Sequence, residues 1–327
     1  MYHDILVPLD GSTFAEQALP HAAFFAKHAK ARLHLVLVHE PMPTWVASSA
    51  GEDTVAADAR PVELSYLDGV VERTKGQVPN GVESALLEAP TAGALAEYAV
   101  RQGFSAELLD RPVAAALATY AGRQSIDLIV LATHGRGPLT RSWFGGVADQ
   151  VVRQVHMPVL FIRPVKGEAS PKKPSYRHIL IPLDASPFAE AVLEHAMTLG
   201  SLSDARFTLL HVVEDTLPAP ALTEFMPTEE FSSASGGPWR EQAAQYLEQC
   251  AARFRAEGRQ VEIATIFGVS PAAFILDEAH RCAVDLIALT THGAKGLRRM
   301  LLGSVTDRVI RGSDIPVLAF RPPATPA

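Results

Sequence analysis

DILVPLDGS, from Asp4 to Ser12, returns later in the chain as HILIPLDAS, from His178 to Ser186. A second pair follows in the same order: DLIVLATHG, from Asp127 to Gly135, and DLIALTTHG, from Asp285 to Gly293. Each member of this pair is followed by a glycine-containing loop, a helical pattern and a short apolar strand, ending in PVLFIRP and PVLAFRP. Because the corresponding stretches occur in the same order, we interpret the chain as a tandem duplication of one domain.

The repeats also set the domain boundaries. We predict a first domain over residues 1–165, a linker over 166–176, a second domain over 177–322 and a short tail over 323–327. The linker is rich in Lys, Pro and Ser, which is typical of connecting segments. The 327 residues are enough for each copy to bury its own core.

Within each copy, short apolar runs rich in β-branched residues alternate with alanine-rich helical patterns. Continuous apolar strands between helices are typical of a parallel sheet that is covered on both faces. We therefore predict α/β architecture: two tandem doubly wound parallel-sheet domains. Such folds bind ligands beyond the carboxyl ends of their strands, where the strand order reverses. Both LD-x-S turns and both THG segments are expected at that edge.

The two copies differ in the middle. Residues 86–102, LLEAPTAGALAEYAVRQ, resemble residues 108–124, LLDRPVAAALATYAGRQ, so we expect an additional βα unit within 86–124 of the first domain. The second copy carries a polar, proline-rich stretch from Thr216 to Pro238, which is typical of a long loop; a lid and a disordered segment are both open interpretations.

Composition limits the classes of function. The net charge of -7 argues against a general binder of nucleic acids or anionic membranes. The chain has only two cysteines, Cys250 and Cys282, and no CxxC spacing, so a reducing compartment is expected. The N-terminus has no basic segment followed by an apolar signal core, and no apolar run approaches the ~20 residues of a membrane span. We predict a cytoplasmic protein without nucleic-acid or membrane partners.

The stretch from Thr291 to Val305, THGAKGLRRMLLGSV, is a candidate anion site. Glycines allow backbone N–H groups to approach an anion, and the N-terminus of the helix expected from about Ser304 adds its positive dipole end. Lys295, Arg298 and Arg299 add cations, so phosphate is the ligand that this loop suits. A solvated basic loop, with Ser304 only as a helix N-cap, is the alternative.

Two further positions have a binding and a structural interpretation. Asp184 follows the first strand of its copy, so its carboxylate could accept a hydrogen bond from a base amino group or a ribose hydroxyl; it could equally cap the helix for which Ser186 and Pro187 are the expected N-cap and first residue. His134 and His292 have no nucleophile or metal ligand at a recognisable spacing, so we interpret them as structural. The sequence predicts no catalytic residue and no metal site.

With these residues in place, the chain resembles a tandem member of the universal stress protein family over nearly all of both halves. The ATP-binding branch of that family carries the motif G-x2-G-x9-G-[ST]. The second copy matches this motif, except that Thr290 stands at the position of the first glycine. The first copy has Ala132 at that position and Gly146 in place of the Ser or Thr. The resemblance implies adenine nucleotide alpha hydrolase-like, Rossmann-like domains that pair through their last strands as an intramolecular pseudo-dimer.

The resemblance also implies the nucleotide-binding positions. Those of the favoured second domain are Pro182, Leu183, Asp184, Val212, Leu289, Thr290, Gly293, Gly303, Ser304 and Val305. Those of the degenerate first domain are Pro8, Leu9, Asp10, Val38, Leu131, Ala132, Gly135, Gly145, Gly146 and Val147.

The implied function is stress-response regulation through ATP, or ADP or AMP, held mainly by the second domain, with Mg²⁺ expected only because ATP usually brings it. Two chains are expected to form a homodimer. An interaction module that binds no nucleotide and a slow ATPase are the alternatives, and we expect no enzyme beyond the latter.

Overall fold

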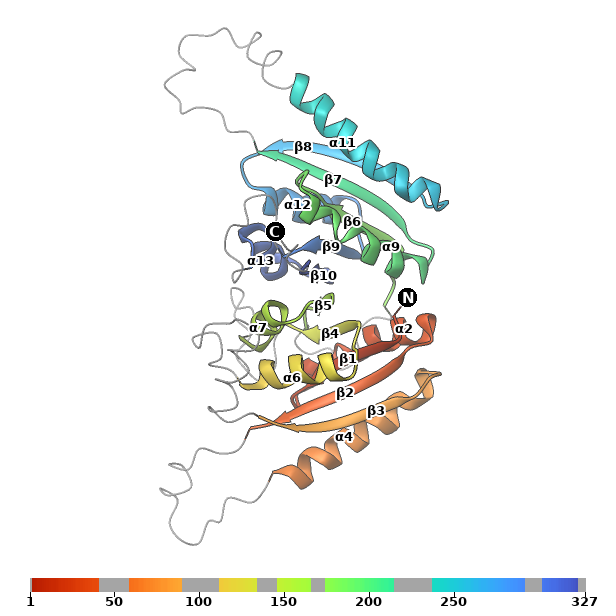
Figure 1. The fold of residues 1–327 in the computed structure, drawn as a ribbon, viewed down its shortest axis with the longest axis vertical. Coiled ribbons are helices and arrows are strands. Elements are labelled where there is room, and N and C mark those ends of the chain that lie inside the picture. The colour runs from red at the N-terminus through yellow and green to blue at the C-terminus, as the bar shows by residue number, and fades with distance from the viewer. Residues whose placement is uncertain are drawn as a thin grey trace, which may run out of the picture. The chain divides into compact units, whose positions relative to one another are not determined.

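The computed structural model describes residues 2–40, 59–89, 112–133, 146–165, 174–214, 237–291 and 302–322. The chain divides into two compact units, Met1–Pro174 and Ser175–Ala327, which we call unit 1 and unit 2. Each unit has one parallel sheet with helices packed against it, as predicted (Figure 1).

The sheet of unit 1 has the strand order β3-β2-β1-β4-β5, and every pairing is parallel. Its strands are β1 (Asp4–Leu9), β2 (Arg32–His39), β3 (Val82–Glu88), β4 (Leu128–Ala132) and β5 (Val159–Ile162). The order reverses between β1 and β4, because the chain first builds outward from β1 to β3 and then returns to the other side of β1. This reversal creates the crevice at which doubly wound sheets bind ligands.

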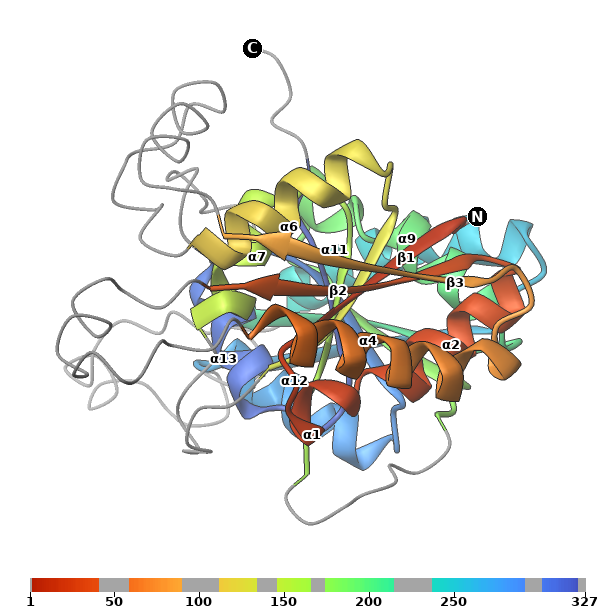
Figure 2. The ribbon, with the colours of Figure 1, turned by 90° about the horizontal axis from the view of Figure 1, so that it is seen from below.

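The helices of unit 1 cover both faces of its sheet. They are α1 (Thr13–Glu16), α2 (Leu19–Ala29), α4 (Arg60–Thr74), the 3₁₀ helix η1 (Lys75–Gln77), α6 (Pro112–Arg123) and α7 (Gly146–Gln154). Figure 2 shows α2 and α4 on one side of β2 and β3, and α6 and α7 on the other. The two-sided cover explains why β1 and β4 are almost wholly buried although their runs do not alternate in polarity.

Unit 2 repeats the arrangement with the strand order β10-β9-β6-β7-β8, again all parallel. Its strands are β6 (His178–Pro182), β7 (Arg206–Glu214), β8 (Val261–Gly268), β9 (Leu286–Thr290) and β10 (Val317–Phe320). Its helices are α8 (Pro187–Glu190), α9 (Leu193–Ser201), α11 (Gly237–Ala256), α12 (Pro271–Arg281) and α13 (Ser304–Gly312).

The first helical pattern of each unit is interrupted. The alanine-rich pattern FAEQALPHAAFFAKHAK of residues 14–30 is typical of one helix, but α1 ends at Glu16 and α2 begins at Leu19, with tight i→i−3 hydrogen bonds between them. Unit 2 has the same break between α8 and α9, although Glu194 stands at the position of Pro20. Proline is therefore not the common cause of the break.

The expected βα insertion falls largely outside the described residues. The described part of 86–124 contains the end of β3 and the helix α6, which correspond to β8 and α12 of unit 2. The proline-rich stretch from Thr216 to Pro238 also lies outside them, except that α11 begins at Gly237. Among the described helices, none combines the length and the apolar character that a membrane crossing requires.

Candidate functional site

The turn that follows the first strand has the same hydrogen bonds in both units. In unit 2, Asp184 Oδ1 accepts from the backbone N–H of Ser186 at 3.1 Å and from its hydroxyl at 2.6 Å. The hydroxyl oxygen of Ser186 in turn accepts from the N–H of Ala189 at 3.1 Å, so Ser186 is the N-cap of α8 as predicted. Asp184 thus supports the cap, and its carboxylate is held at the carboxyl end of β6.

Unit 1 matches this turn with Asp10 and Ser12, at 2.9 Å for the backbone bond and 2.6 Å for the hydroxyl bond. The residue between the two has a left-handed backbone in each unit: Gly11 with φ 80° and Ala185 with φ 61°. The turn therefore needs a residue with positive φ, which glycine adopts without strain and alanine does not.

The second strand brings its carboxyl end to the same edge. Val38 on β2 and Val212 on β7 are half-buried and lie just beyond the residues that pair with the ends of β1 and β6. In unit 2 the ring of His211 is tied to the Asp184 turn, because its Nδ1 lies 2.7 Å from the carbonyl oxygen of Leu183. The N–H of Leu183 also donates to the carbonyl of Leu210 at 2.8 Å, which extends the pairing of the two strands into the turn.

The fourth strand of unit 2 is tied directly to the start of α13. The N–H of Gly303 donates to the carbonyl of Thr291 at 2.7 Å, and the hydroxyl of Thr306 donates to the carbonyl of Thr290 at 2.7 Å. Thr306 is buried, so its hydrogen bond is shielded from water. The amino end of α13 is thereby fixed beside the end of β9.

Ser304 is not the N-cap of α13, contrary to the alternative interpretation from the sequence. The N-cap of α13 is Gly303, and Ser304 is the first helical residue, with its side chain exposed. No side chain caps α13. The helix N-terminus therefore presents backbone N–H groups and a serine hydroxyl together, which is a donor set that suits an anion.

Unit 1 lacks parts of this arrangement. Its helix α7 begins at Gly146, which has no hydroxyl, and Ala148 stands where Thr306 anchors α13 in unit 2. The end of its fourth strand, β4, is still tied to β5, because the N–H of Thr133 donates to the carbonyl of Ile162 at 2.8 Å.

The described candidate positions gather at one edge of each sheet. Pro8, Leu9, Asp10, Val38, Leu131, Ala132, Gly146 and Val147 lie there in unit 1, and Pro182, Leu183, Asp184, Val212, Leu289, Thr290, Gly303, Ser304 and Val305 in unit 2. Gly135, Gly145 and Gly293 lie outside the described residues, as do His134, His292 and the basic residues Lys295, Arg298 and Arg299. Within the described ranges, no three His, Cys, Asp or Glu side chains are grouped as metal ligands would be.

One side-chain cluster beside this edge was not predicted from the sequence. Arg73 on α4 pairs with Glu16 of α1 at 3.0 Å, and Arg253 on α11 pairs with Glu190 of α8 at 3.5 Å. A third repeat, Tyr-Leu-x5-Arg, occurs in these two helices, which otherwise share little sequence, and could have predicted that they are equivalent.

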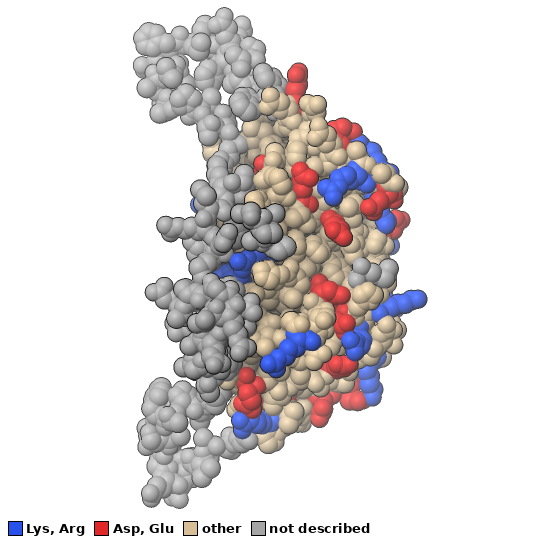
Figure 3. Space-filling view, viewed as in Figure 1, with Lys and Arg blue, Asp and Glu red and all other residues tan. Residues whose placement is uncertain are grey.

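The charged surface shows no large region of one sign on the face drawn in Figure 3, where acidic and basic side chains of the described residues are interspersed. The ion pairs among the described residues are mostly exposed at one or both partners. Such pairs contribute little to stability and create no broad basic face.

Comparison with known proteins agrees with this architecture. The sequence profile of the universal stress protein family matches residues 1–163 and 175–321. A universal stress protein of Mycolicibacterium smegmatis is 26% identical over 325 residues, which cover 98% of this chain and 97% of that protein. The crystal structure of a universal stress protein from Archaeoglobus fulgidus shares the fold, with a TM-score of 0.63 and 16% identity over 97% of this chain and 98% of that chain.

A domain solved as a universal stress protein in complex with cAMP is 19% identical and covers 45% of this chain and 98% of its own, with a TM-score of 0.34.

Proposed function

The chain belongs to the universal stress protein family, and from this premise we propose that unit 2 binds ATP or a related adenine nucleotide in a stress-response role. The observation that carries the proposal is the juxtaposition of the Asp184 turn with the uncapped start of α13 at one edge of the sheet. An acceptor and a set of anion-binding donors at a topological switch point suit the two ends of a nucleotide.

The residues of unit 2 fit the two halves of such a ligand. Asp184 supplies a carboxylate for a donor on the base or the ribose. Ser304 and the first N–H groups of α13 supply donors for phosphate oxygens, and Thr306 holds these donors beside β9. Mg²⁺ is expected only because ATP usually brings it.

Unit 1 is proposed as the weaker site. Gly146 offers only its backbone N–H where Ser304 adds a hydroxyl, and Ala148 lacks the anchor of Thr306. One hydrogen bond to a charged group is worth about 1.5–3 kcal/mol, so we expect unit 1 to bind ATP at least about tenfold more weakly.

The first experiment counts the nucleotide released by the denatured protein after purification and measures ATP affinity by calorimetry. One ATP per chain supports a single working site in unit 2, and two would mean that Gly146 is tolerated. No nucleotide, with no binding of added ATP, would contradict the proposal.

Variants assign the site. Asp184→Asn keeps an oxygen that can accept from Ser186, so the turn survives while the charge is lost, and we expect ATP affinity to fall about tenfold or more. Gly303→Val should weaken binding more strongly, whereas Ser304→Ala removes one hydroxyl and should do less. Asp10→Asn is the matched control in unit 1 and should leave the tighter site unchanged. Wild-type affinity in both Asp184→Asn and Gly303→Val would place the nucleotide elsewhere.

A second function, an interaction module without nucleotide, is favoured by Thr290 and Gly146 at positions where the family motif has glycine and serine or threonine. A slow ATPase would require phosphate release above that of Asp184→Asn. A cytoplasmic location, pairing of the two units through their last strands and assembly of two chains stay predictions.

A further inference from the structure

One histidine near the candidate site of unit 2 stands where unit 1 has a leucine. His211 lies on β7 directly before Val212, and its counterpart on β2 is Leu37, directly before Val38. Leu37 is buried, and His211 is half-buried. Because leucine fills this position in unit 1, packing on the sheet does not require an imidazole here. The role of the histidine has to be sought in its hydrogen bond.

The two units end their first strand in different ways. In unit 1 the pairing of β1 with β2 continues to Leu9, whereas in unit 2 the pairing of β6 with β7, two strands that lie side by side in Figure 1, ends at Pro182. One residue further on, Nδ1 of His211 lies 2.7 Å from the carbonyl oxygen of Leu183. A side chain of β7 thus binds the main chain of unit 2 at the residue where unit 1 still has its sheet pairing.

The imidazole of His211 is held from two sides. A carbonyl oxygen can only accept, so Nδ1 carries a proton and donates it to Leu183. The ring also packs edge-on against the ring of Tyr246 on α11, with ring centroids 6.2 Å apart. The donor is therefore directed at the turn by contacts with two different elements.

The carbonyl that His211 binds belongs to the peptide that joins Leu183 to Asp184. A peptide unit is planar, so a bond that fixes its carbonyl also fixes the direction in which the chain enters Asp184. The N–H of Leu183 donates to the carbonyl of Leu210 at 2.8 Å. On the other side, Asp184 Oδ1 accepts from the N–H and the hydroxyl of Ser186 at 3.1 Å and 2.6 Å. Asp184 is thus anchored both before and after its own residue.

We infer that His211 is a positioning residue of the unit 2 site, which holds Asp184 in the orientation that binds a donor on the base or the ribose. This inference rests on the proposed function. The histidine acts through the carbonyl of Leu183 and not through a contact of its own with the ligand. Leu37 has no donor, so unit 1 cannot form this bond. The two units therefore differ at the nucleoside end of the proposed ligand as well as at the phosphate end.

Substitutions of His211 separate its hydrogen bond from the rest of the side chain. His211→Leu introduces the residue of unit 1 and removes the donor, so ATP affinity, measured by calorimetry on the full chain, should fall about fivefold. His211→Ala, which removes the donor without adding bulk, should show a similar loss. His211→Asn keeps an N–H donor close to the place of Nδ1, so its ATP affinity should stay within about twofold of wild type.

His280→Leu is the matched control in the same unit. Nδ1 of His280 lies 2.8 Å from the carbonyl oxygen of Leu276, so this histidine makes the same kind of bond, at the end of α12 that leads into β9. Its replacement should leave ATP affinity unchanged. Thermal unfolding of each variant without nucleotide shows whether the protein is folded before affinities are compared.

Double-mutant cycles show whether His211 acts through Asp184. In the Asp184→Asn background, His211→Leu should change ATP affinity by less than about twofold, because the charged acceptor is already absent. In the Ser304→Ala background it should still lower affinity about fivefold, because Ser304 belongs to the phosphate end of the site. A general structural role of His211 would instead give the same loss in both backgrounds.

The outcomes separate this inference from the proposed function. Absence of ATP binding by the wild type overturns both. Unchanged affinity in His211→Leu overturns only the positioning role, and so do equal losses in His211→Leu and His211→Asn, because the Nδ1 donor would then not be the cause. Equal losses in the Asp184→Asn and Ser304→Ala backgrounds would show that the histidine does not act through Asp184.

Discussion

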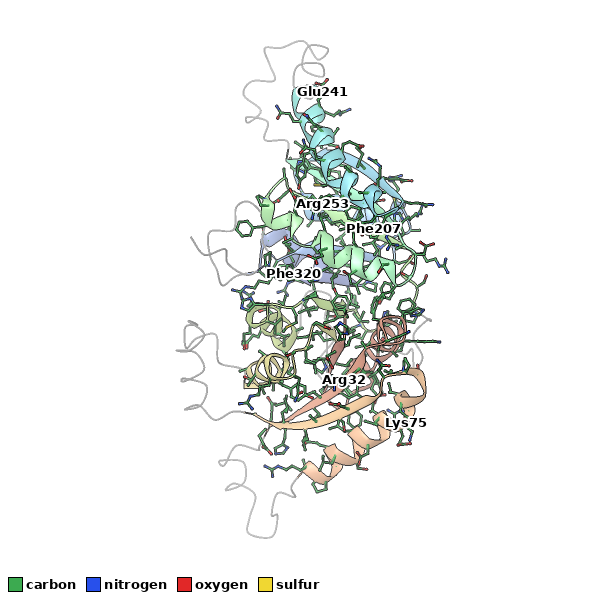
Figure 4. All side chains as sticks on the ribbon, turned by 45° about the vertical axis from the view of Figure 1, so that its right-hand side comes forward. Arg32, Lys75, Phe207, Glu241, Arg253 and Phe320 are labelled. Atoms are coloured by element: carbon green, nitrogen blue, oxygen red, sulfur yellow. The ribbon has the colours of Figure 1, made fainter. Side chains whose placement is uncertain are left out.

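Gly200→Ala tests the packing between α9 and the sheet of unit 2. A Cβ atom at Gly200 would lie 2.4 Å from Cζ and 2.8 Å from Cε1 of Phe207, and 3.2 Å from Cδ1 of Ile179. The first two distances are about 1 Å shorter than ordinary carbon contacts. The Phe207 ring, labelled in Figure 4, is fully buried and packs edge-on against Phe254 with ring centroids 4.8 Å apart, so it has little room to move.

Two opposing terms set the size of the effect. Overpacking of a tight core costs roughly 1–3 kcal/mol, whereas alanine is favoured over glycine within a helix by about 0.8–1.0 kcal/mol. Gly200 lies next to the last residue of α9, so only part of that helix preference applies. We expect Gly200→Ala to lower the free energy of unfolding of unit 2 by about 1–2 kcal/mol.

Unit 1 supplies the compensating change. Its corresponding residues are Ala26 and Leu33, both fully buried, so a larger helix residue is combined with a smaller strand residue. Phe207→Leu alone should destabilise unit 2 by leaving a void, but in combination with Gly200→Ala the two losses should cancel by about 1 kcal/mol or more.

The assay has to report on unit 2 separately, because a chain of two units need not unfold in one step. Urea unfolding combined with native-state hydrogen exchange of the β6 and β7 amides reads the local stability. If Gly200→Ala stabilised these amides by the helix-propensity gain, or if the double variant were the simple sum of the single ones, the packing argument would be wrong.

Two further predictions concern the turn and the opposite edge of unit 1. Ala185→Gly should stabilise the protein by up to about 1 kcal/mol, and Gly11→Ala should destabilise it by a similar amount. A left-handed backbone costs a residue with a Cβ about 1–2 kcal/mol, and part of the gain from glycine is lost because glycine has more freedom in the unfolded state. Thermal unfolding that shows the same sign for both variants would contradict this reasoning. Burial raises the pKa of Asp4, but hydrogen bonds from Arg32 and His34 outweigh burial and leave the pKa below 3.8. A carboxylate whose pKa is lowered in the native state contributes stability that is complete above its unfolded-state pKa and is lost as pH falls through its native pKa. The loss of unfolding free energy caused by Asp4→Asn, measured by urea unfolding, should therefore be largest near neutral pH and shrink below about pH 4. A constant difference between the variant and wild type across that pH range would exclude this linkage.

Much of the fold could be predicted because the information is local and repeated. The apolar runs of β1 and β6 are two copies of one sequence pattern, and both are typical of a buried strand. Ser186 and Pro187 are residue types that are preferred at the start of a helix, and they predict the start of α8. A helix from about Ser304 was also predicted, and α13 begins at that residue. The break between α1 and α2 was not, because the helical periodicity of residues 14–30 continues across it.

The candidate site divides in the same way. The Asp184 turn and the Gly303–Ser304 helix start are short segments whose roles follow from their residue types, so each could be named without coordinates. That Ser304 follows the cap, and that the Thr306 hydroxyl anchors α13 to β9, depends on how the loop returns to the strand end. Residue spacing cannot give that geometry.

By itself, the sequence determined that the chain holds two copies of one parallel α/β domain and that one copy keeps more of an anion-binding loop, because repeats, periodicity and capping residues act within a few residues along the chain. Only the tertiary structure decided that Arg253 on α11 pairs with Glu190 on α8, and that Gly200 leaves room for Phe207. Contacts of this kind arise from the packing of helices onto a sheet, where volumes and buried polar groups from distant segments have to fit together at the same time.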